Sequence, residues 1–241
     1  MLLTVCGFSA FFIMQDERAG IAAVTDVLAS PTVVPRDISS REVDPDPLTA
    51  AEVFPTSEIA IVPGQPAYQV LKTQESADCR AGATDDLRAL LAEAGCSQLV
   101  RGTLKSPTGA YLVTGGIFNL ATEENANKVY DGVKPLVDAN KGRFTGLVAG
   151  KETQPIALAE THLGWDVRGH YLVYCVIARA DGKKFDPGDP YARQIIYDMI
   201  VLHLKNTVLE KRAVTVVDPG ASGAPDATGT PGGEPSPGTS G

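Results

Sequence analysis

The side chains best suited to chemistry gather in one short stretch of the chain. His162, Asp166 and His170 are spaced four residues apart, and Glu160 stands just before them. A histidine beside a carboxylate is the pairing that general acid–base catalysis uses, and the same residue types are common metal ligands. No third ligand stands at a metal-site spacing, so we predict no metal site. We interpret the histidines as structural or surface residues, and a hydrolase that uses His162 or His170 with Asp166 is the alternative.

Three other features carry less chemical information. Trp165 follows a glycine in the same stretch, and we keep it as a further candidate for ligand contact, although an aromatic beside a hairpin usually covers a core or a sheet edge. His203 has no histidine or glutamate four residues further on, so the zinc-helix pattern is absent. Thr114–Gly116 lies inside an expected strand, so its glycines indicate a bulge or a close backbone approach rather than a phosphate loop. We expect no cofactor.

Cys79 and Cys96 lie on either side of a predicted helix, and the residues between Cys79 and Thr84 leave enough slack for the chain to fold back along it. We therefore predict a disulfide between them. Closing a loop of about 17 residues stabilises a fold by roughly 3 kcal/mol and implies an oxidising compartment. The alternative is two unrelated buried thiols in a cytosolic protein. Cys175 lies in a β-prone run, Tyr171–Ile177, and we expect it to be a small buried hydrophobic residue.

The chain begins with an apolar run, Met1–Met14, which ends at a charged cluster. Fourteen residues rise about 21 Å as a helix, which is short of the roughly 30 Å hydrocarbon core of a bilayer. The run has no basic start and no small-x-small cleavage site, as a signal peptide would have. It is either a buried helix of the fold or the outer part of a membrane anchor. The proline-rich chain from Ala22 to Pro55 favours the anchor, because a core helix seldom hangs on such a linker.

Composition divides the chain into four parts. After the anchor, 1–14, we predict a flexible proline-rich stalk, 15–55, an α+β globular domain, 56–215, and a disordered Gly/Pro/Ser tail, 216–241, with too few apolar residues to offset the entropy of ordering. The domain is long enough to bury a stable core. The net charge of -8 argues against nucleic acid as a partner and against adsorption of the domain to anionic lipid. Membrane contact should therefore come from the N-terminal segment.

The apolar pattern of the body predicts a mixture of helices and strands. Helical spacing of apolar residues begins after Thr84, after Thr122 and after the pair Asp189–Pro190. Alternating or β-prone runs predict the strands, which are Tyr68–Thr73, Ser97–Leu104, Ala110–Phe118, Arg143–Ala149, Ala157–Leu163 and Gly169–Ala180. Ser106–Gly109 suits a hairpin turn between the second and the third of these strands.

The order of these elements is strand, helix, hairpin, helix, strands, helix. Because strands occur in runs rather than in strict alternation with helices, we predict an α+β fold. The expected architecture is a two-layer sandwich of ferredoxin-like kind, a mainly antiparallel sheet with helices packed on one face. The other face would then be free for solvent, a partner or a second protomer.

Three stretches of the body carry a resemblance to a known group of proteins. They are the segment from Cys79 to Thr103, the segment Ala110–Leu120 and the segment Gly169–Ala180. The resemblance extends over most of the predicted domain. In these stretches the chain resembles uncharacterised single-pass membrane proteins of high-GC actinobacteria. The resemblance implies an N-terminal membrane helix, a short extracytoplasmic stalk and one small α+β domain with no assigned activity. This chain differs from the pattern in its short, uncharged N-terminus, and the resemblance supplies no catalytic residues.

These observations predict a location more than an activity. We expect a non-enzymatic extracytoplasmic domain, anchored to the cell membrane by a single segment, whose partner is another envelope protein, a second copy of itself or a small ligand. The alternative is an envelope hydrolase that uses His162 or His170 with Asp166, and it requires those side chains to converge in a concave pocket. A third interpretation is a cytosolic fold in which Met1–Met14 packs as a core helix and all four cysteines are reduced.

Overall fold

A computed structural model of the protein describes residues 32–217. The larger of its two compact units comprises Pro35–Thr215. A separate two-stranded sheet pairs β1 (Thr32–Pro35) with β8 (Val214–Val217). The predicted anchor, residues 15–31 of the predicted stalk and residues 218–241 of the predicted tail lie outside the described residues.

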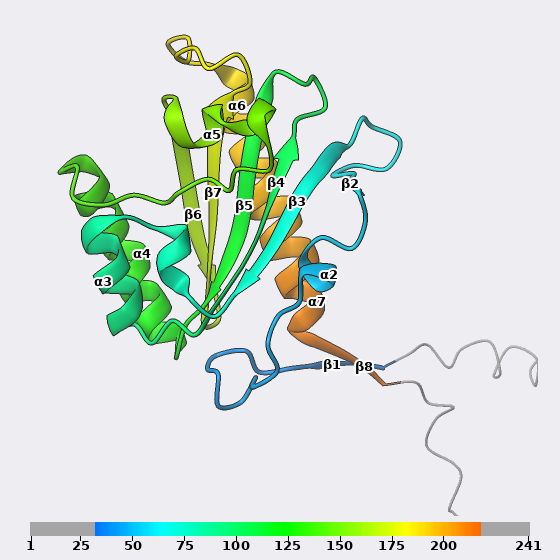
Figure 1. Cartoon of the computed structure of the whole chain (residues 1–241). Coiled ribbons are helices and arrows are strands. Elements are labelled where there is room, and N and C mark those ends of the chain that lie inside the picture. The colour runs from blue at the N-terminus through cyan, green and yellow to red at the C-terminus, as the bar shows by residue number, and fades with distance from the viewer. Residues whose placement is uncertain (1–31, 218–241) are drawn as a thin grey trace, which may run out of the picture. The chain divides into compact units, whose positions relative to one another are not determined.

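A six-stranded antiparallel sheet forms the centre of the larger unit (Figure 1). Its order is β2-β3-β4-β5-β7-β6, and every neighbouring pair is antiparallel. Two tight hairpins, β4–β5 and β6–β7, supply four of the strands, and the turn predicted at Ser106–Gly109 is confirmed. Gly109 (φ +72°) and Gly169 (φ +55°) adopt the left-handed conformation that glycine tolerates best in such turns. The strands are β2 (Glu58–Ile59), β3 (Tyr68–Ser76), β4 (Gln98–Lys105), β5 (Tyr111–Asn119), β6 (His162–Arg168) and β7 (Tyr171–Arg179).

Helices cover both faces of this sheet (Figure 1). One face carries η1 (Cys79–Gly82), α3 (Asp85–Glu93), α4 (Glu123–Asp138) and, after η2 (Lys151–Thr153), α5 (Pro155–Leu158). The other face carries α2 (Ala50–Val53) and a long C-terminal helix, in which α6 (Pro190–Tyr197) continues through a π-helical stretch (Asp198–Leu209) into α7 (Glu210–Arg212). Within residues 32–217, none of the helices combines the length and the apolar character that crossing a bilayer requires.

The predicted helix starts are confirmed, two of them by direct capping. Thr122 Oγ1 accepts a hydrogen bond from the backbone of α4, and Asp189 Oδ1 accepts two from the first turn of α6, where Pro190 stands at the first position. Thr84 precedes α3 as expected, but its hydroxyl accepts from Arg143 N at 3.2 Å instead of capping the helix. Side-chain caps therefore fix where α4 and α6 begin.

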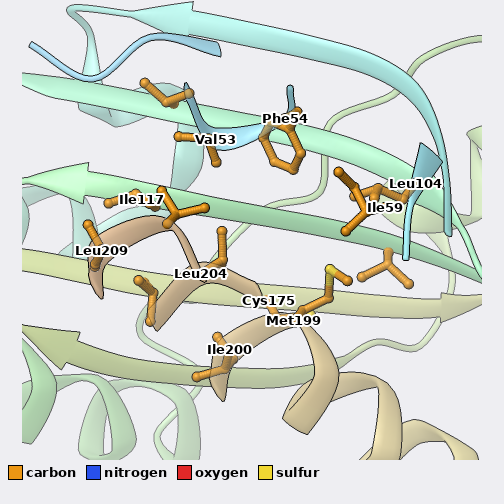
Figure 2. Close-up of a cluster of buried hydrophobic side chains, with 14 of the residues drawn as sticks. Val53, Phe54, Ile59, Leu104, Ile117, Cys175, Met199, Ile200, Leu204 and Leu209 are labelled. Atoms are coloured by element: carbon orange, nitrogen blue, oxygen red, sulfur yellow. The ribbon is translucent and has the colours of Figure 1, made fainter. Parts of the chain in front are cut away.

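Two apolar clusters fill the spaces between the sheet and its helices. The cluster under the C-terminal helix includes Met199, Leu204 and Leu209, which pack on residues of β4, β5 and β7 such as Ile117 (Figure 2). Phe54 lies over Gly102 so closely that a Cβ there would stand 2.8 Å from its ring. The cluster on the opposite face joins α3 and α4 to the sheet through Leu87, Leu91, Phe118, Val129, Phe144 and Tyr174.

The α+β class and the mainly antiparallel sheet are confirmed, but the finer prediction differs from the structure. Helices lie on both faces, and the strand order with only antiparallel neighbours departs from the two-layer, ferredoxin-like arrangement. The reason lies in β5 and β7, where residues pointing to either face are buried along almost the whole strand. Strands that are buried on both faces need cover on two sides. The expectation of a free sheet face is therefore wrong.

The chain from Arg36 to Phe54 also differs from the flexible stalk that we predicted. Ile38, Leu48 and Val53 are buried in the core, and α2 lies within this segment. Prolines and aspartates made the segment look unable to pack. The segment is ordered instead because it lies across one end of the sheet, where its few apolar side chains and its backbone find partners.

Two predicted strands are wrong. Arg143–Ala149 forms only one isolated bridge, between Phe144 and Ala83, because the segment crosses a sheet face and bonds to side chains there. Leu147 N, for example, donates to the hydroxyl of Thr114 at 3.0 Å. The predicted strand Ala157–Leu163 is wrong except at its last two residues, because α5 (Pro155–Leu158) covers its start and β6 begins only at His162.

Candidate functional site

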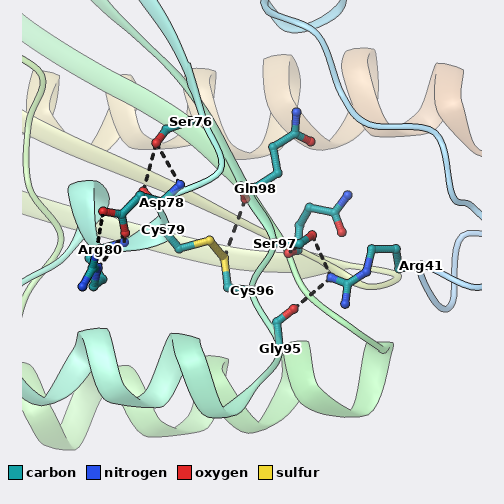
Figure 3. Close-up of a disulfide and its surroundings, with 10 residues drawn as sticks. Arg41, Ser76, Asp78, Cys79, Arg80, Gly95, Cys96, Ser97 and Gln98 are labelled. Atoms are coloured by element: carbon teal, nitrogen blue, oxygen red, sulfur yellow. Dashed lines mark hydrogen bonds and ion pairs between the residues drawn. A yellow bond between two sulfur atoms is a disulfide. The ribbon is translucent and has the colours of Figure 1, made fainter.

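The disulfide predicted between Cys79 and Cys96 is present (Figure 3). Cys79 opens η1, Cys96 follows the end of α3, and the two Cα atoms are 6.3 Å apart. Gly95, with φ +70°, turns the chain after α3 so that Cys96 N donates to Leu91 O. The bond spans 17 residues of sequence and fixes η1 beside the start of β4.

Cys175 is a free cysteine in the middle of β7, and it is fully buried. It belongs to the apolar cluster under the C-terminal helix, which confirms the prediction of a small buried hydrophobic residue. Burial raises the pKa of its thiol well above the ordinary range. A thiol held protonated in this way is a poor nucleophile, because the thiolate is the reactive form.

The two candidate histidines lie in different surroundings. His162 is half-buried at the start of β6, and its ring stacks on Phe185 with 4.0 Å between the centroids. His170 lies in the turn between β6 and β7 and is fully buried. Its Nδ1 is 2.8 Å from Ile38 O, and burial outweighs that contact and lowers the pKa of the ring. The neutral ring therefore donates from Nδ1 to Ile38 O, which belongs to the segment Arg36–Phe54.

Asp166 and Trp165 are neighbours on β6, so their side chains point to opposite faces of the sheet. Asp166 forms an ion pair with Lys205 of the C-terminal helix. Trp165 Nε1 donates to Tyr130 O of α4 at 3.1 Å. Each side chain thus links the edge strand to the helix that covers its own face.

The structure does not bring the four candidates together. His162 and Asp166 share a face of β6 but stand four residues apart, which is about 13 Å along a strand. In the part of the chain that the structure describes, no hydrogen bond joins any two of the four candidates. No group of three or more histidine, cysteine, aspartate or glutamate side chains within residues 32–217 is arranged to hold a metal ion. The convergence that the hydrolase requires is not present in these positions.

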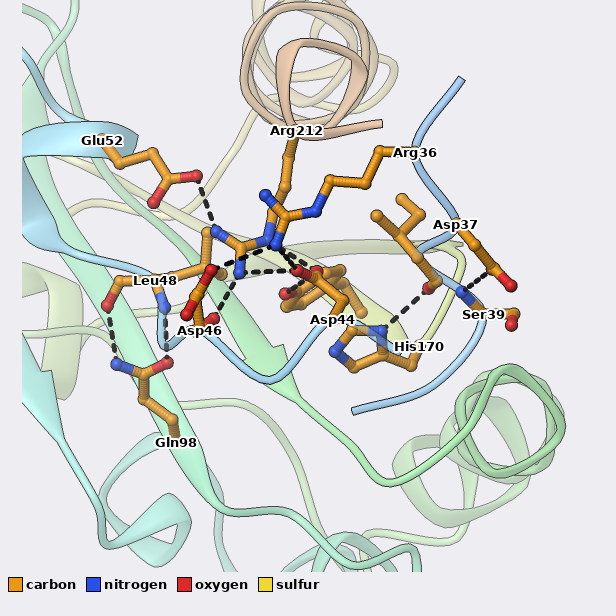
Figure 4. Close-up of polar contacts among 12 residues, drawn as sticks. Arg36, Asp37, Ser39, Asp44, Asp46, Leu48, Glu52, Gln98, His170 and Arg212 are labelled. Atoms are coloured by element: carbon orange, nitrogen blue, oxygen red, sulfur yellow. Dashed lines mark hydrogen bonds and ion pairs between the residues drawn. The ribbon is translucent and has the colours of Figure 1, made fainter. Parts of the chain in front are cut away.

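A buried charge cluster, which the sequence did not indicate, lies where the segment Arg36–Phe54 meets α7 (Figure 4). This segment is called the N-terminal segment of the domain below. Asp44 has no exposed surface, and its carboxylate accepts from Arg212 Nε at 2.7 Å and from Arg212 Nη2 at 3.0 Å. Tyr171 OH donates to the same carboxylate at 2.7 Å, and Arg36 also pairs with it. Arg212 Nη1 also donates to Glu52 Oε1 at 3.0 Å, and Arg212 Nη2 donates to the main-chain carbonyl of Asp46.

These contacts determine the protonation states of the cluster. Burial alone would raise the pKa of Asp44, but the hydrogen bonds from Arg212 and Tyr171 outweigh it, and the pKa lies below its ordinary value. Burial is the largest single influence on Arg212 and would lower the pKa of its guanidinium, but the contacts with Asp44, Tyr171 and Glu52 together outweigh it and raise that pKa. Burial, followed by the bond to Asp44, raises the pKa of the Tyr171 phenol. The cluster therefore contains an ionised aspartate and a neutral tyrosine donor.

A hollow of about 230 Å³ opens beside the charge cluster, with Arg36, Glu52, His203 and Arg212 among its walls. All three nitrogens of Arg212 already donate to protein acceptors. His203 is buried and its Nε2 lies 2.9 Å from Val53 O, while burial lowers the pKa of the ring to about 4. These groups are engaged with one another, so the cluster clamps the N-terminal segment to the C-terminal helix.

The geometry thus defines a disulfide-bonded α+β domain in which the segment Arg36–Phe54 is clamped to α7 by buried charges. The partners in the clamp, Asp44 and Arg212, are 168 residues apart in sequence, so no local spacing could have indicated them. No family model, no curated protein and no solved structure matches the chain.

Proposed function

We propose that this chain is a non-enzymatic, membrane-tethered domain on the extracytoplasmic side of the cell envelope, where it binds another envelope protein, a second copy of itself or a small ligand. The observation that carries the proposal is the disulfide between Cys79 and Cys96. Structural disulfides persist in oxidising compartments and are rare in the cytosol. A domain of this size can build a stable core without crosslinks, so the bond points to a compartment rather than to a fold that depends on it.

The sequence before the domain supports the tether. Met1–Met14 is apolar, and the larger compact unit begins at Pro35, so residues 15–34 are available to link the two. The resemblance to single-pass actinobacterial envelope proteins supports the same arrangement. The proposal for the membrane rests on these sequence features.

The contacts of the candidate catalytic side chains favour a binding role over catalysis. His170 and Asp166 each have a structural partner, Ile38 O and Lys205 respectively, and His162 is stacked on an aromatic ring. Cys175 is buried with a raised pKa. Side chains engaged in this way stabilise the fold and are not free to transfer protons or attack a substrate.

Cell fractionation tests the location. The full chain should be found in the membrane fraction and should be degraded when protoplasts are treated with an external protease. A variant that lacks residues 1–14 is the matched control, because it should leave the membrane fraction while its domain still folds. Recovery of the full chain in the cytosol, protected from the protease, would contradict the proposal.

Crosslinking in the intact envelope, followed by mass spectrometry, tests the binding role. We expect either a homodimer or one specific adduct that competes with unlabelled purified domain. The absence of any adduct, together with a monomeric domain that binds no small molecule, would count against this part of the proposal.

A further inference from the structure

The six-stranded sheet has one long edge to which no described strand is added, and this edge is β6 (Figure 1). β6 stands last in the strand order and pairs with β7 over all 7 of its residues without a register shift. The strand at the other edge, β2, has only 2 residues. Natural proteins protect an edge strand by keeping it short or by placing a proline, a lysine or a bulge in it. β6 has none of these features.

The backbone of β6 directs alternate polar groups away from β7. Val167 N donates to the side-chain Oδ1 of its neighbour Asp166 at 2.8 Å, so this N–H points to the outer side of the strand. Residues two apart in an antiparallel strand direct their N–H and C=O groups to the same side, so those of Leu163 and Trp165 also point outward. None of the backbone hydrogen bonds that residues 32–217 make outside their helices and strands uses these groups. The edge can therefore pair with a further strand.

The polar face of this edge is complementary to itself. When the edges of two copies run antiparallel with Gly164 opposite Gly164, each residue faces the one equally far on the other side of that glycine. Glu160 then faces Arg168, which carries the opposite charge. His162 faces Asp166, to which an imidazole N–H can donate. Cross-strand pairs of opposite charge stabilise a sheet and like charges destabilise it, so this register has the favourable pairs and no like-charged ones.

The opposite face of the edge is apolar. Leu163 and Trp165 are partly exposed on the face that α4 covers, and in the same register they face each other across the contact. Tyr130 of α4 lies beside them, because Trp165 Nε1 donates to Tyr130 O, and the tyrosine is 41% exposed. Burying these apolar side chains against a second copy would remove their exposed surface from water, which is favourable. A second copy therefore matches both faces of the edge.

The charged residues at the two ends of the edge are accessible. The chain is already extended at Ala159 (φ −88°, ψ 176°), so Glu160 leads directly into β6. Glu160 is exposed and belongs to none of the ion pairs among the described residues. Arg168 pairs with Glu210, but both side chains are exposed, and such surface pairs contribute little. Arg168 can therefore turn to a carboxylate of a second copy at little cost.

We propose that the chain forms a two-fold symmetric dimer in which β6 pairs antiparallel with β6 of a second copy, in register about Gly164, so that the two sheets become continuous. A two-fold contact requires a surface that complements itself, and both faces of this edge do so. In the dimer Val167 N donates to the backbone of the second copy, which releases the carboxylate of Asp166 for His162 of that copy. The proposal rests on the proposed function, since it names the second copy as the partner in that binding role.

A disulfide trap on the purified full chain tests the contact and its register. Glu160→Cys and Arg168→Cys are prepared as separate variants, mixed, oxidised mildly and separated on a non-reducing gel. In the proposed register the two new cysteines face each other with about 4.5 Å between their Cα atoms, which a disulfide can bridge. Up to about half of the mixed chains should become covalent dimers, because the two variants pair at random. Each variant alone is the matched control, because its two copies of the new cysteine would lie about 26 Å apart.

Trp165 is the only tryptophan of the chain, so its fluorescence reports on the same edge. On dilution of the unmodified chain its emission should shift to longer wavelength as the dimer dissociates, and analytical ultracentrifugation should show the same transition. A mixture that gives no more covalent dimer than each variant alone, or a chain that is monomeric at every concentration, would overturn the proposal. Because these measurements use purified protein, they are independent of where the chain is located in the cell, so failure here is distinguishable from failure of the proposed function.

Discussion

The buried clamp makes a strong prediction about Asp44. Replacing Asp44 by asparagine keeps the shape of the side chain but removes the charge that faces Arg212 and Arg36. The side chain of Arg212 is only 5% exposed, so its charge would stay buried with one carboxylate fewer. Breaking a buried ion pair by removing one partner destabilises a fold by about 3–5 kcal/mol. That is a large fraction of the roughly 5–15 kcal/mol by which a domain is stable.

Urea unfolding followed by circular dichroism measures this loss. For an m-value of about 2 kcal/mol/M, the expected midpoint shift of Asp44→Asn is about 2 M. Asp181→Asn is the matched control, because Asp181 also pairs with an arginine, Arg179, but at the surface. Exposed ion pairs contribute little, so the control should unfold near the midpoint of the unmodified chain.

A second substitution tests whether the uncompensated charge of Arg212 causes the loss of stability. Adding Arg212→Met to Asp44→Asn removes the uncompensated charge, so the double variant should recover part of the lost stability. A midpoint for Asp44→Asn that equals the Asp181→Asn midpoint would refute the reasoning. So would a double variant whose loss is the full sum of the two single losses, because the pair would then not be coupled.

Three further predictions concern the interior of the domain. Burial holds the pKa of His203 at about 4, below its ordinary 6.5, so the folded state binds this proton less readily. The His203 contribution to stability should be full above pH 6.5 and should fall by up to about 3 kcal/mol as the pH drops towards 4. Urea titrations of His203→Gln should therefore show a shallower pH dependence than the unmodified chain, with only the share of groups such as His170 remaining. Gly116→Ala should destabilise by about 1–3 kcal/mol, because its Cβ would stand 2.6 Å from a tyrosine ring, whereas Gly115→Ala, with 3.7 Å to its nearest neighbour, should be tolerated in the same assay. Reducing the bond between Cys79 and Cys96 should lower the unfolding free energy by about 3 kcal/mol, and an unchanged midpoint in reductant would contradict the entropic estimate.

Local signals in the sequence predicted the local structure well. Thr122 and the pair Asp189–Pro190 mark helix starts through their own capping chemistry, and the hairpin at Ser106–Gly109 needs only a turn between two β-prone runs. The close approach expected at the glycines of β5 is confirmed at Gly116, where neighbouring atoms leave no room for a Cβ. These features depend on residues a few positions apart.

Features that depend on distant residues were missed. The apolar run of β7 predicted a strand. The same run is unbroken from Tyr171 to Ala178, and an unbroken apolar strand is also the sequence signal for a sheet that is covered on both faces, as the burial of β7 shows. Nothing near Asp44 in the sequence indicates that its partner is Arg212, so the segment that carries Asp44 looked like a flexible linker.

The central claim is that a disulfide-bonded domain resides outside the cytosol, and peptide mapping of the native protein tests it most directly. The chain is isolated from its host with free thiols blocked under denaturing, non-reducing conditions, and is then digested and analysed by mass spectrometry. The account predicts a peptide pair joined through Cys79 and Cys96, with Cys175 carrying the blocking group. Blocking groups on Cys79, Cys96 and Cys175 alike would contradict it.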